Sequence, residues 1–309
     1  MRRNTWIATT AGVLVIAVAA VVVGVTVGSP APEPTRAARA TTTPTPSPTP
    51  EPTRTPTPTL AAVPAAPSDA ALAALPLAFH DAVVPQLLDG GDVEPEDTWQ
   101  IATPRTPLVA LYASPSSRGR PVATLSHLVS TINRPAATAI WGRSPGKDGG
   151  MLLVSTPSRN RTPGDGGDPD APSATFAWAR AADFTIVRTD RMITVDVAAS
   201  TVSVVTRKGA VTATEVARLG TPEDPTPTDT ATYVEAAYVD TRVAYTQGNP
   251  IILTGAHSSR IPSYGGNAAL TALHYYPDPT GSSHGCVRIS AEMTKTLAAL
   301  PVGTPIRFT

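Results

Sequence analysis

The hydrophobic and polar positions of this 309-residue chain fall into stretches with clearly different patterns. The first contains TWIATTAGVLVIAVAAVVVGVTVG (residues 5–28), which has no charge and no polar face. Because about 20 apolar helical residues cross a bilayer, we expect residues 1–28 to form a cytoplasmic tip and a transmembrane anchor. Arg2 and Arg3 favour a cytoplasmic N-terminus, which places the rest of the chain outside the cytoplasm. A cleaved signal peptide, whose apolar region is usually about 7–15 residues long, is the alternative.

Proline and threonine dominate the second stretch, residues 29–67, which includes TTTPTPSPTPEPTRTPTPT. Proline fixes φ and removes a backbone donor, and this stretch has nothing with which to form a core. We expect a semi-rigid, polyproline-like linker. At about 3.1 Å per residue, such a linker could hold a domain on the order of 100 Å from the membrane.

Short apolar runs separated by glycine and proline fill the third stretch, residues 68–189. The runs ATAIWGRS, GGMLLVSTPSRN and ATFAWARAADFTIV are typical of short strands, with Trp141 and Trp178 as core aromatics. We expect a small β-barrel, and the order of its elements resembles that of bacterial SH3-like domains. Such a module is either a binding and positioning module or a spacer that adds stability, and the sequence leaves both open.

Alternating apolar positions mark the start of the fourth stretch, residues 190–309. Apolar side chains recur at Ile193, Val195 and Val197 and again at Val202 and Val204, which predicts two half-buried strands. The tripeptide RKG at 207–209 then supplies a hairpin turn. This part of the chain is therefore mostly β.

A short helix and a closing strand are expected at the C-terminus. Ser290 is the expected N-cap of a helix with Met293, Leu297 and Leu300 on one face, and Pro301 ends it. Ile306 and Phe308 then begin the last strand.

Composition excludes two classes of function. Lysine plus arginine and aspartate plus glutamate both number 24, and no basic tract is interleaved with aromatic residues, so we expect no nucleic-acid partner. The chain has one cysteine, which excludes an internal disulfide and a multi-cysteine metal cluster. That cysteine, Cys286, lies in GSSHGCVRIS and has to be explained alone.

A nucleophilic cysteine needs a neighbouring base or cation, because a free thiol is only a few per cent ionised at neutral pH. Three of the five histidines precede Cys286 in the same stretch, namely His257, His274 and His284. His274 ends the apolar run AALTALH and would face Cys286 across a loop, whereas His284 would point to the same side as Cys286 in an extended segment. Arg288 continues this alternation and could bind a substrate carboxylate.

The other two histidines, His80 and His127, belong to the third stretch. We expect each to be a surface residue or to be satisfied by hydrogen bonds within the fold.

The segment LHYYPDPTGSSHGCVRIS resembles the signature of the L,D-transpeptidase catalytic domain. In that family a histidine is followed at some distance by Ser-His-Gly-Cys, an apolar residue and Arg or Asn. RLGTPEDPTPTDTATYV and LPVGTPIRF resemble two further segments of the family in the same order, so the resemblance covers residues 190–309. It implies an L,D-transpeptidase-type β-sandwich with one or two short helices. Together with the N-terminal transmembrane helix and the SH3-like small β-barrel expected from the earlier stretches, the chain should be mainly β.

This chain departs from the family pattern at three places. Tyr275 follows His274 where the family commonly has glycine, and Asp229, Thr230 and Ala231 replace Gly-Thr-Phe. Only 12 positions separate His274 from Cys286, a short gap for the family, which should narrow or reshape the acyl-donor site. His257 therefore remains an alternative base, although its surroundings, TGAHSS, better suit the rim of the site.

The resemblance implies a peptidoglycan L,D-transpeptidase that forms 3→3 cross-links. Cys286 would attack a stem tetrapeptide, form a thioester and release D-alanine, with His274 as the base and a backbone carbonyl near Tyr275 holding its tautomer. The N–H groups of Gly285 and Cys286 are the expected oxyanion donors. Three further side chains would orient the substrate: Ser283, His284 and Arg288.

The same resemblance implies that peptidoglycan stem peptides are the partners and that carbapenem-type β-lactams acylate Cys286. It implies neither a cofactor nor a metal. The protein would then be a single-pass membrane protein whose C-terminal domains lie in the cell-wall space.

Four other interpretations of Cys286 were weighed. The three nearby histidines and the cysteine could bind zinc, but a His-x-Cys pair is a cramped ligand spacing. A papain-like peptidase has its cysteine before its histidine, whereas every candidate histidine here comes first. A tethered wall-binding protein with a weak or inactive site is the third, although it would not require both a cysteine and a histidine. A buried structural cysteine is the last, although Gly285 and Arg288 are poor core neighbours.

Overall fold

The computed structural model describes residues 60–264, 266, 268–278 and 280–309. The expected transmembrane anchor and all but the last residues of the expected linker lie outside the described residues. Within the described part, every helix falls short of the length and apolar character that crossing a bilayer requires. The end of the expected linker contacts the fold that follows, since the Lys147 N–H donates to the carbonyl of Ala61 at 2.9 Å.

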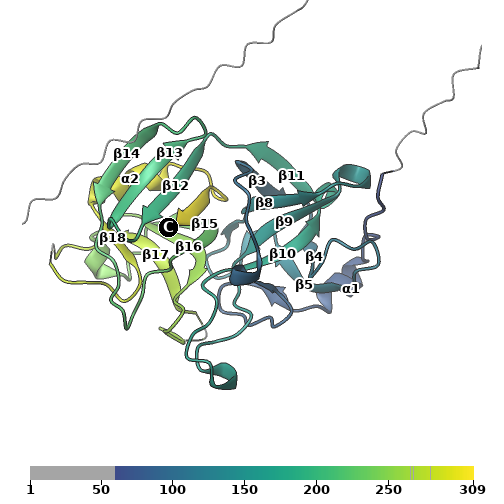
Figure 1. The fold of residues 1–309 in the computed structure, drawn as a ribbon, viewed down its shortest axis with the longest axis horizontal. Helices are drawn as coiled ribbons and strands as arrows, with labels where there is room; N and C mark the ends of the chain where they lie inside the picture. The colour runs from purple at the N-terminus through teal and green to yellow at the C-terminus, as the bar shows by residue number, and fades with distance from the viewer. Residues whose placement is uncertain (1–59, 265, 267, 279) are drawn as a thin grey trace, which may run out of the picture. The chain divides into compact units, whose positions relative to one another are not determined.

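The third stretch of the sequence forms a nine-stranded sheet, in which β2 pairs with β10 and the other strands follow the order β1-β5-β4-β10-β9-β8-β3-β11. Figure 1 shows this sheet curling into a nearly closed, barrel-like form. The helix α1 (Asp69–Ala73) precedes it, capped by the Ser68 hydroxyl. The strands are β1 (Leu77–Ala78), β2 (Leu88–Asp89), β3 (Gln100–Pro104), β4 (Leu108–Tyr112), β5 (Pro121–Ser126), β8 (Thr138–Ser144), β9 (Met151–Thr156), β10 (Thr175–Arg180) and β11 (Phe184–Arg188), with the separate pair β6 (Leu128–Val129) and β7 (Arg134–Pro135).

One of the two expected core aromatics of this sheet is fully buried. Trp141 is 0% exposed and its indole N–H donates to the Ser155 hydroxyl at 2.7 Å. Trp178, on the interior strand β10, is only partly buried, although it packs against two apolar clusters. The mainly β character is confirmed, and the SH3-like label remains a prediction.

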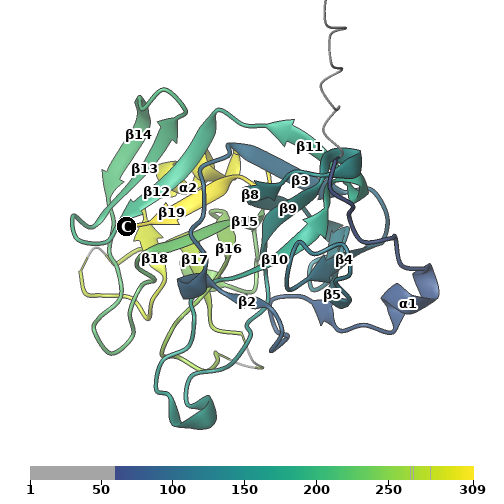
Figure 2. The same cartoon turned by 45° about the vertical axis from the view of Figure 1, so that its right-hand side comes forward.

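The fourth stretch forms an eight-stranded sheet with the order β14-β13-β12-β19-β15-β16-β17-β18. Figure 2 shows β19 beside β12, and β15 to β18 continuing the sheet. Residues of β12 and β13 pack with residues of β15 to β18 into one apolar core, so the sheet folds over on itself. Its strands are β12 (Arg191–Asp196), β13 (Thr201–Thr206), β14 (Val211–Val216), β15 (Thr230–Tyr238), β16 (Ile251–His257), β17 (Leu270–Tyr275), β18 (Val287–Ile289) and β19 (Pro305–Phe308).

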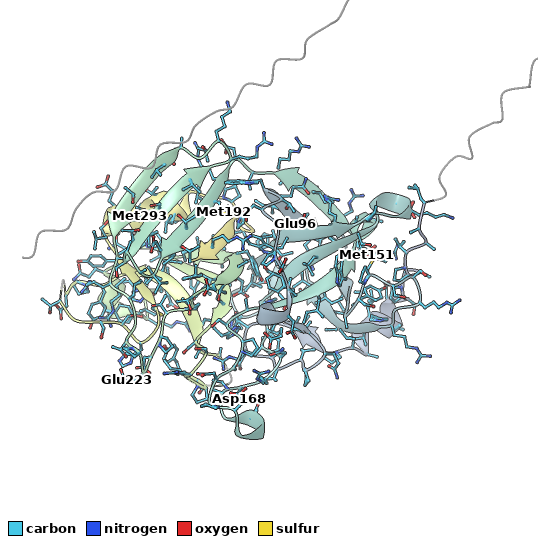
Figure 3. The ribbon with its side chains drawn as sticks, in the orientation of Figure 1. Glu96, Met151, Asp168, Met192, Glu223 and Met293 are labelled. Atoms are coloured by element: carbon cyan, nitrogen blue, oxygen red, sulfur yellow. The ribbon has the colours of Figure 1, made fainter. Side chains whose placement is uncertain are left out.

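The local predictions for this sheet are confirmed except at Val197, which follows the end of β12 and is only partly buried, and at the end of the helix. The alternating residues Ile193, Val195, Val202 and Val204 are all buried. The Ser290 hydroxyl accepts the Met293 N–H at 3.0 Å and caps α2 (Ala291–Ala298). The helix ends at Ala298, before Pro301, because the residue that precedes a proline is disfavoured in the α conformation. Met293 on α2 and Met192 on β12 are labelled in Figure 3.

The described residues from 60 onward form one compact unit in which the two sheets share a core. Trp141 and Phe176 of the first sheet pack with Met192 and Tyr233 of the second. The Arg307 guanidinium lies 4.9 Å from the centre of the Trp141 ring. The two sheets are therefore in direct contact, although the sequence pattern changes at residue 190.

Candidate active site

Cys286 lies directly before β18, at one edge of the second sheet. β18 runs parallel to β17 with Leu273 opposite Val287 and His274 opposite Arg288. One step back, this register places Cys286 beside Ala272. Since alternate residues of a strand share a face, Cys286, Arg288 and His274 lie on the same face of the sheet. Diagonal neighbours on one face are about 7–8 Å apart at the backbone, within reach of an imidazole and a thiol.

A cavity of about 370 Å³ opens on this face. Five of the sequence-predicted residues line it, namely His274, Ser283, His284, Cys286 and Arg288. No carboxylate of the described chain lines it, and most of the remaining wall is aromatic or aliphatic. The other lining residues are Tyr238, Tyr245, Ile251, Leu253, Tyr264, Leu270, Ala272 and Tyr276.

His274 is nearly buried, at 6% exposed, and its orientation is fixed by the backbone. Its Nδ1 lies 2.9 Å from the carbonyl oxygen of Tyr275, the carbonyl that the sequence analysis expected. A carbonyl only accepts, so Nδ1 carries the proton and Nε2 keeps a free lone pair. The Tyr245 ring packs beside the imidazole with ring centres 5.3 Å apart. Burial lowers the pKa of His274, and the charges of Arg288 and Arg218 lower it further.

The Cys286 thiol is partly exposed and donates to the Leu270 carbonyl at 3.8 Å rather than to His274. Burial raises its pKa, while an N–H from Ala272 and the charge of Arg288 partly oppose that rise. With the His274 pKa lowered and the thiol pKa raised, both groups are neutral near pH 7. The pair is thus a thiol beside a neutral base, not a thiolate beside an imidazolium.

The residues immediately before Cys286 form a bend, not the extended segment expected from the sequence. Gly285 has φ +88°, which a side chain would strain, and a Cβ there would lie 3.0 Å from the Pro225 carbonyl oxygen. Because of this bend, His284 does not follow the simple alternation with Cys286. Its Nδ1 instead lies 2.5 Å from Asp224 Oδ2, and its side chain is 75% exposed.

Ser283 is buried and stabilises the same bend. It is 3% exposed and its hydroxyl donates to the carbonyl of Cys286. The hydroxyl of Tyr264 donates to the carbonyl of His284, from the opposite side of the chain. Both contacts hold the backbone that carries the cysteine.

Two arginines make one end of the cavity positive. The Arg288 guanidinium lies 4.0 Å from the centre of the Tyr276 ring and donates to the Ser282 carbonyl at 2.7 Å. Its Nε is buried without a hydrogen-bond partner among the described residues. Arg218 lies alongside, donating to the carbonyl of Tyr276 at 3.1 Å, and its backbone pairs with that of Arg288.

His257 and Tyr275, both assigned to the site from the sequence, do not line the cavity. His257 is the last residue of β16, and its side chain is 1% exposed. Its Nε2 donates to the His80 carbonyl at 2.9 Å, and burial lowers its pKa to about 3. Tyr275 contributes only its carbonyl. His80 is satisfied within the fold, as expected, with Nδ1 lying 3.3 Å from Glu235 Oε1.

Sequence reasoning missed Arg218, Asp224 and the tyrosines Tyr245 and Tyr264. Arg218 and Asp224 lie in RLGTPEDPTPTDTATYV, a segment that resembles the family but offered no reason to place these two side chains at the site. Tyr245 and Tyr264 lie in loops that carry no local pattern. Within the part of the chain that is described, no group of three or more His, Cys, Asp or Glu side chains could hold a metal ion.

The sequence of residues 190–307 matches the YkuD family model, described as the L,D-transpeptidase catalytic domain. Residues 190–307 form an L,D-transpeptidase catalytic domain. The whole cavity around Cys286 falls within this match.

Solved L,D-transpeptidases from three organisms resemble the chain at low identity. The structure from Stackebrandtia nassauensis is 19% identical over 40% of this chain and 57% of its own, with a TM-score of 0.28. That from Mycobacterium smegmatis is 17% identical over 52% of this chain and 90% of its own, with a TM-score of 0.30. L,D-transpeptidase 1 of Mycobacterium tuberculosis is 19% identical over 43% of this chain and 77% of its own, with a TM-score of 0.27.

At these TM-scores the structural likeness supports no further conclusion. The chain spans little more than half the length of the Stackebrandtia protein. No curated protein sequence matches the chain. Assignment of the L,D-transpeptidase domain thus rests on the family match.

Proposed function

We propose that this protein is a peptidoglycan L,D-transpeptidase that forms 3→3 cross-links through a thioester on Cys286. The observation that supports this most is the shared face of β17 and β18. There the only cysteine of an L,D-transpeptidase domain lies in a cavity with a histidine whose Nε2 is free to accept a proton.

Acylation begins when Cys286 Sγ attacks the carbonyl carbon of the third residue, a diamino acid, of a stem tetrapeptide. The thiol proton passes to His274 Nε2 as the carbon–sulfur bond forms. The carbonyl oxygen gains negative charge, and the N–H groups of Gly285 and Cys286 stabilise it. The bond to the terminal D-alanine then breaks, His274 returns the proton to the leaving amine, and D-alanine departs.

Deacylation repeats these steps with a new amine. The acceptor amine attacks the thioester carbonyl and loses a proton to His274, which then protonates the departing Cys286 sulfur. A new amide bond forms and the free thiol returns, so no oxidant or cofactor is consumed.

The charge around the cavity suits such a substrate. Arg288 and Arg218 leave one end of a cavity without carboxylates positive, which favours a substrate carboxylate there. The tyrosine and leucine side chains provide apolar surface for the carbon chain of a diamino acid. From the sequence, we further propose that residues 1–28 anchor the protein and that residues 29–67 extend it into the cell-wall space.

Intact-mass spectrometry of the full-length protein tests this proposal. The protein is incubated with a carbapenem and, separately, with a disaccharide tetrapeptide. We expect one adduct with each reagent, loss of D-alanine from the tetrapeptide, and neither adduct in Cys286→Ala. A folded wild-type protein that gains no adduct from either reagent would favour the tethered wall-binding alternative.

A further inference from the structure

Arg159, in the loop that follows β9, is a buried cation without a carboxylate partner among the described residues. It is 1% exposed, and its Nη2 donates to the carbonyls of Ser258 and Ile261, each at 2.9 Å. Its Nε and Nη1 have no hydrogen-bond partner in the described structure. Burial lowers its pKa to about 10, so it stays charged near neutral pH. A buried charge is costly, and the cost is not offset here by an opposite charge.

The two carbonyls that Arg159 binds belong to one short segment of the catalytic domain. We call residues 258–264, which leave the end of β16, the Tyr264 segment. Its first residues are held by the loop between β9 and β10 and by the loop that precedes β15. The Ala171 N–H donates to the Ser259 carbonyl at 2.8 Å, and Arg260 pairs with Asp170 at 2.8 Å and donates to the Pro222 carbonyl at 2.6 Å. Asp168 and Glu223, close in sequence to Asp170 and Pro222, are labelled in Figure 3.

The other end of this segment reaches the cavity. Tyr264 lines the cavity, and its hydroxyl donates to the carbonyl of His284, two residues before Cys286. Burial raises the pKa of Tyr264, so the hydroxyl stays protonated and keeps its donor. Otherwise Tyr264 is 54% exposed, so its position depends on the backbone that carries it.

We propose that Arg159 is a positioning residue for the transpeptidase reaction, which holds the Tyr264 segment so that Tyr264 braces the backbone of the cysteine-bearing bend. The proposal rests on the proposed function of Cys286. Arg159 lies outside the matched catalytic domain, so the module formed by residues 68–189 contributes a part of the active site that the domain lacks by itself.

The test is the rate of acylation of the full-length protein by the disaccharide tetrapeptide, measured for Arg159→Met. Met keeps the length of the side chain and removes the donors. We expect kcat/KM for acylation to fall roughly 10- to 100-fold, as expected when a reacting group is displaced by about 1 Å. Alkylation of Cys286 by iodoacetamide should stay within about twofold of wild type, because a small reagent does not need the braced bend.

Arg161→Met is the matched control. Arg161 lies in the same loop but pairs with Asp89 and Asp168 and not with the Tyr264 segment. It should keep the wild-type rate of acylation. If Arg159→Met does not fold, Arg159→Lys retains the charge with one nitrogen, and an intermediate loss of kcat/KM is expected from it.

A double-mutant cycle with Tyr264→Phe separates positioning from general loosening of the fold. If Arg159 acts through Tyr264, then Arg159→Met lowers kcat/KM by less than about twofold in the Tyr264→Phe background. An equal loss in both backgrounds, or no loss in either, would overturn the proposal.

Tryptic cleavage after Arg260 provides a readout that does not depend on acylation. Arg159→Met should be cut there several times faster than Arg161→Met, because local opening exposes the segment. A wild-type protein that is not acylated would count against the proposed function, whereas equal cleavage of the two variants would count against the role of Arg159.

Discussion

Two histidines near opposite ends of the β16–β17 pair show what distinguishes a reactive site from a structural one. His274 and His257 are both buried, both hydrogen-bond a backbone carbonyl, and both have a lowered pKa. His274 opens on a cavity that it shares with a thiol, whereas His257 faces the His80 carbonyl and does not line that cavity. A lowered pKa alone therefore does not distinguish the proposed base from a structural histidine, whereas the cavity shared with the thiol does.

Replacing each of the two histidines by glutamine should give the largest difference in acylation rate. His274→Gln removes the proposed base, so we expect acylation by the tetrapeptide to fall by roughly 10²- to 10⁴-fold. In His257→Gln the amide can still donate to the His80 carbonyl, and the rate should stay within about an order of magnitude of wild type. Single-turnover mass spectrometry measures both, and a larger loss in His257→Gln would reverse the assignment of the base.

Arg288→Met should give the next largest effect. A charge-assisted hydrogen bond to a substrate carboxylate is worth about 1.5–3 kcal/mol, so kcat/KM should fall roughly 10- to 100-fold, mainly through KM. Arg242→Met is the matched control, because Arg242 pairs with Asp240 and does not line the cavity. An unchanged KM in Arg288→Met would show that its charge does not bind substrate.

The pH dependence of the thiol tests the neutral state of the pair. Burial lowers the pKa of His274 and raises the pKa of Cys286 from their ordinary values. The rate of acylation should therefore fall only in acidic solution, once the pH drops below the lowered pKa of His274 and the imidazole gains a proton. Alkylation by iodoacetamide needs the thiolate, so its midpoint should lie above 9.0. An alkylation midpoint near neutrality would indicate a preformed ion pair.

The smallest expected effect concerns the stability of the fold around His257, the histidine that does not line the cavity. Glu235 contacts His80 there, and the pKa of each is raised, that of Glu235 by burial and that of His80 because Glu235 outweighs its burial. A raised pKa stabilises the fold at low pH, so the contribution of His80 to the free energy of unfolding should fall as pH rises and His80 loses its proton. The buried histidines with lowered pKa values act in the opposite direction, so the prediction concerns the difference between wild type and His80→Gln, which should shrink by on the order of 1 kcal/mol between pH 6 and pH 8. Urea unfolding of both proteins at the two pH values measures this difference, and a difference that does not change with pH would contradict the pairing.

The sequence predicts the residues around the proposed nucleophile better than the contacts that hold them in place. Cys286, His274 and Arg288 lie in one segment, and the parallel pairing of β18 with β17 brings them to one face. His284 was placed by simple alternation, which fails because Gly285 turns the chain through a left-handed conformation. A period of two holds only while the backbone stays extended.

Contacts between distant segments were beyond the reach of local patterns. Tyr264 reaches the His284 carbonyl, and Arg159 reaches the Ser258 and Ile261 carbonyls from about 100 residues away in the chain. Neither residue has a neighbour in sequence that marks it, since a tyrosine or an arginine in a polar loop is ordinarily a surface residue. Only the fold shows that these contacts lead to the bend that precedes Cys286.

The core shared by the two sheets limits how this chain could be recombined with other domains. Met192, Ala231 and Tyr233 of the catalytic domain are buried against Trp141 and Phe176 of the preceding module. A chimera that joined residues 190–309 to an unrelated partner would leave those side chains in water unless the new partner offered a matching surface. The two modules are thus joined by one buried core, although the family match covers only one of them.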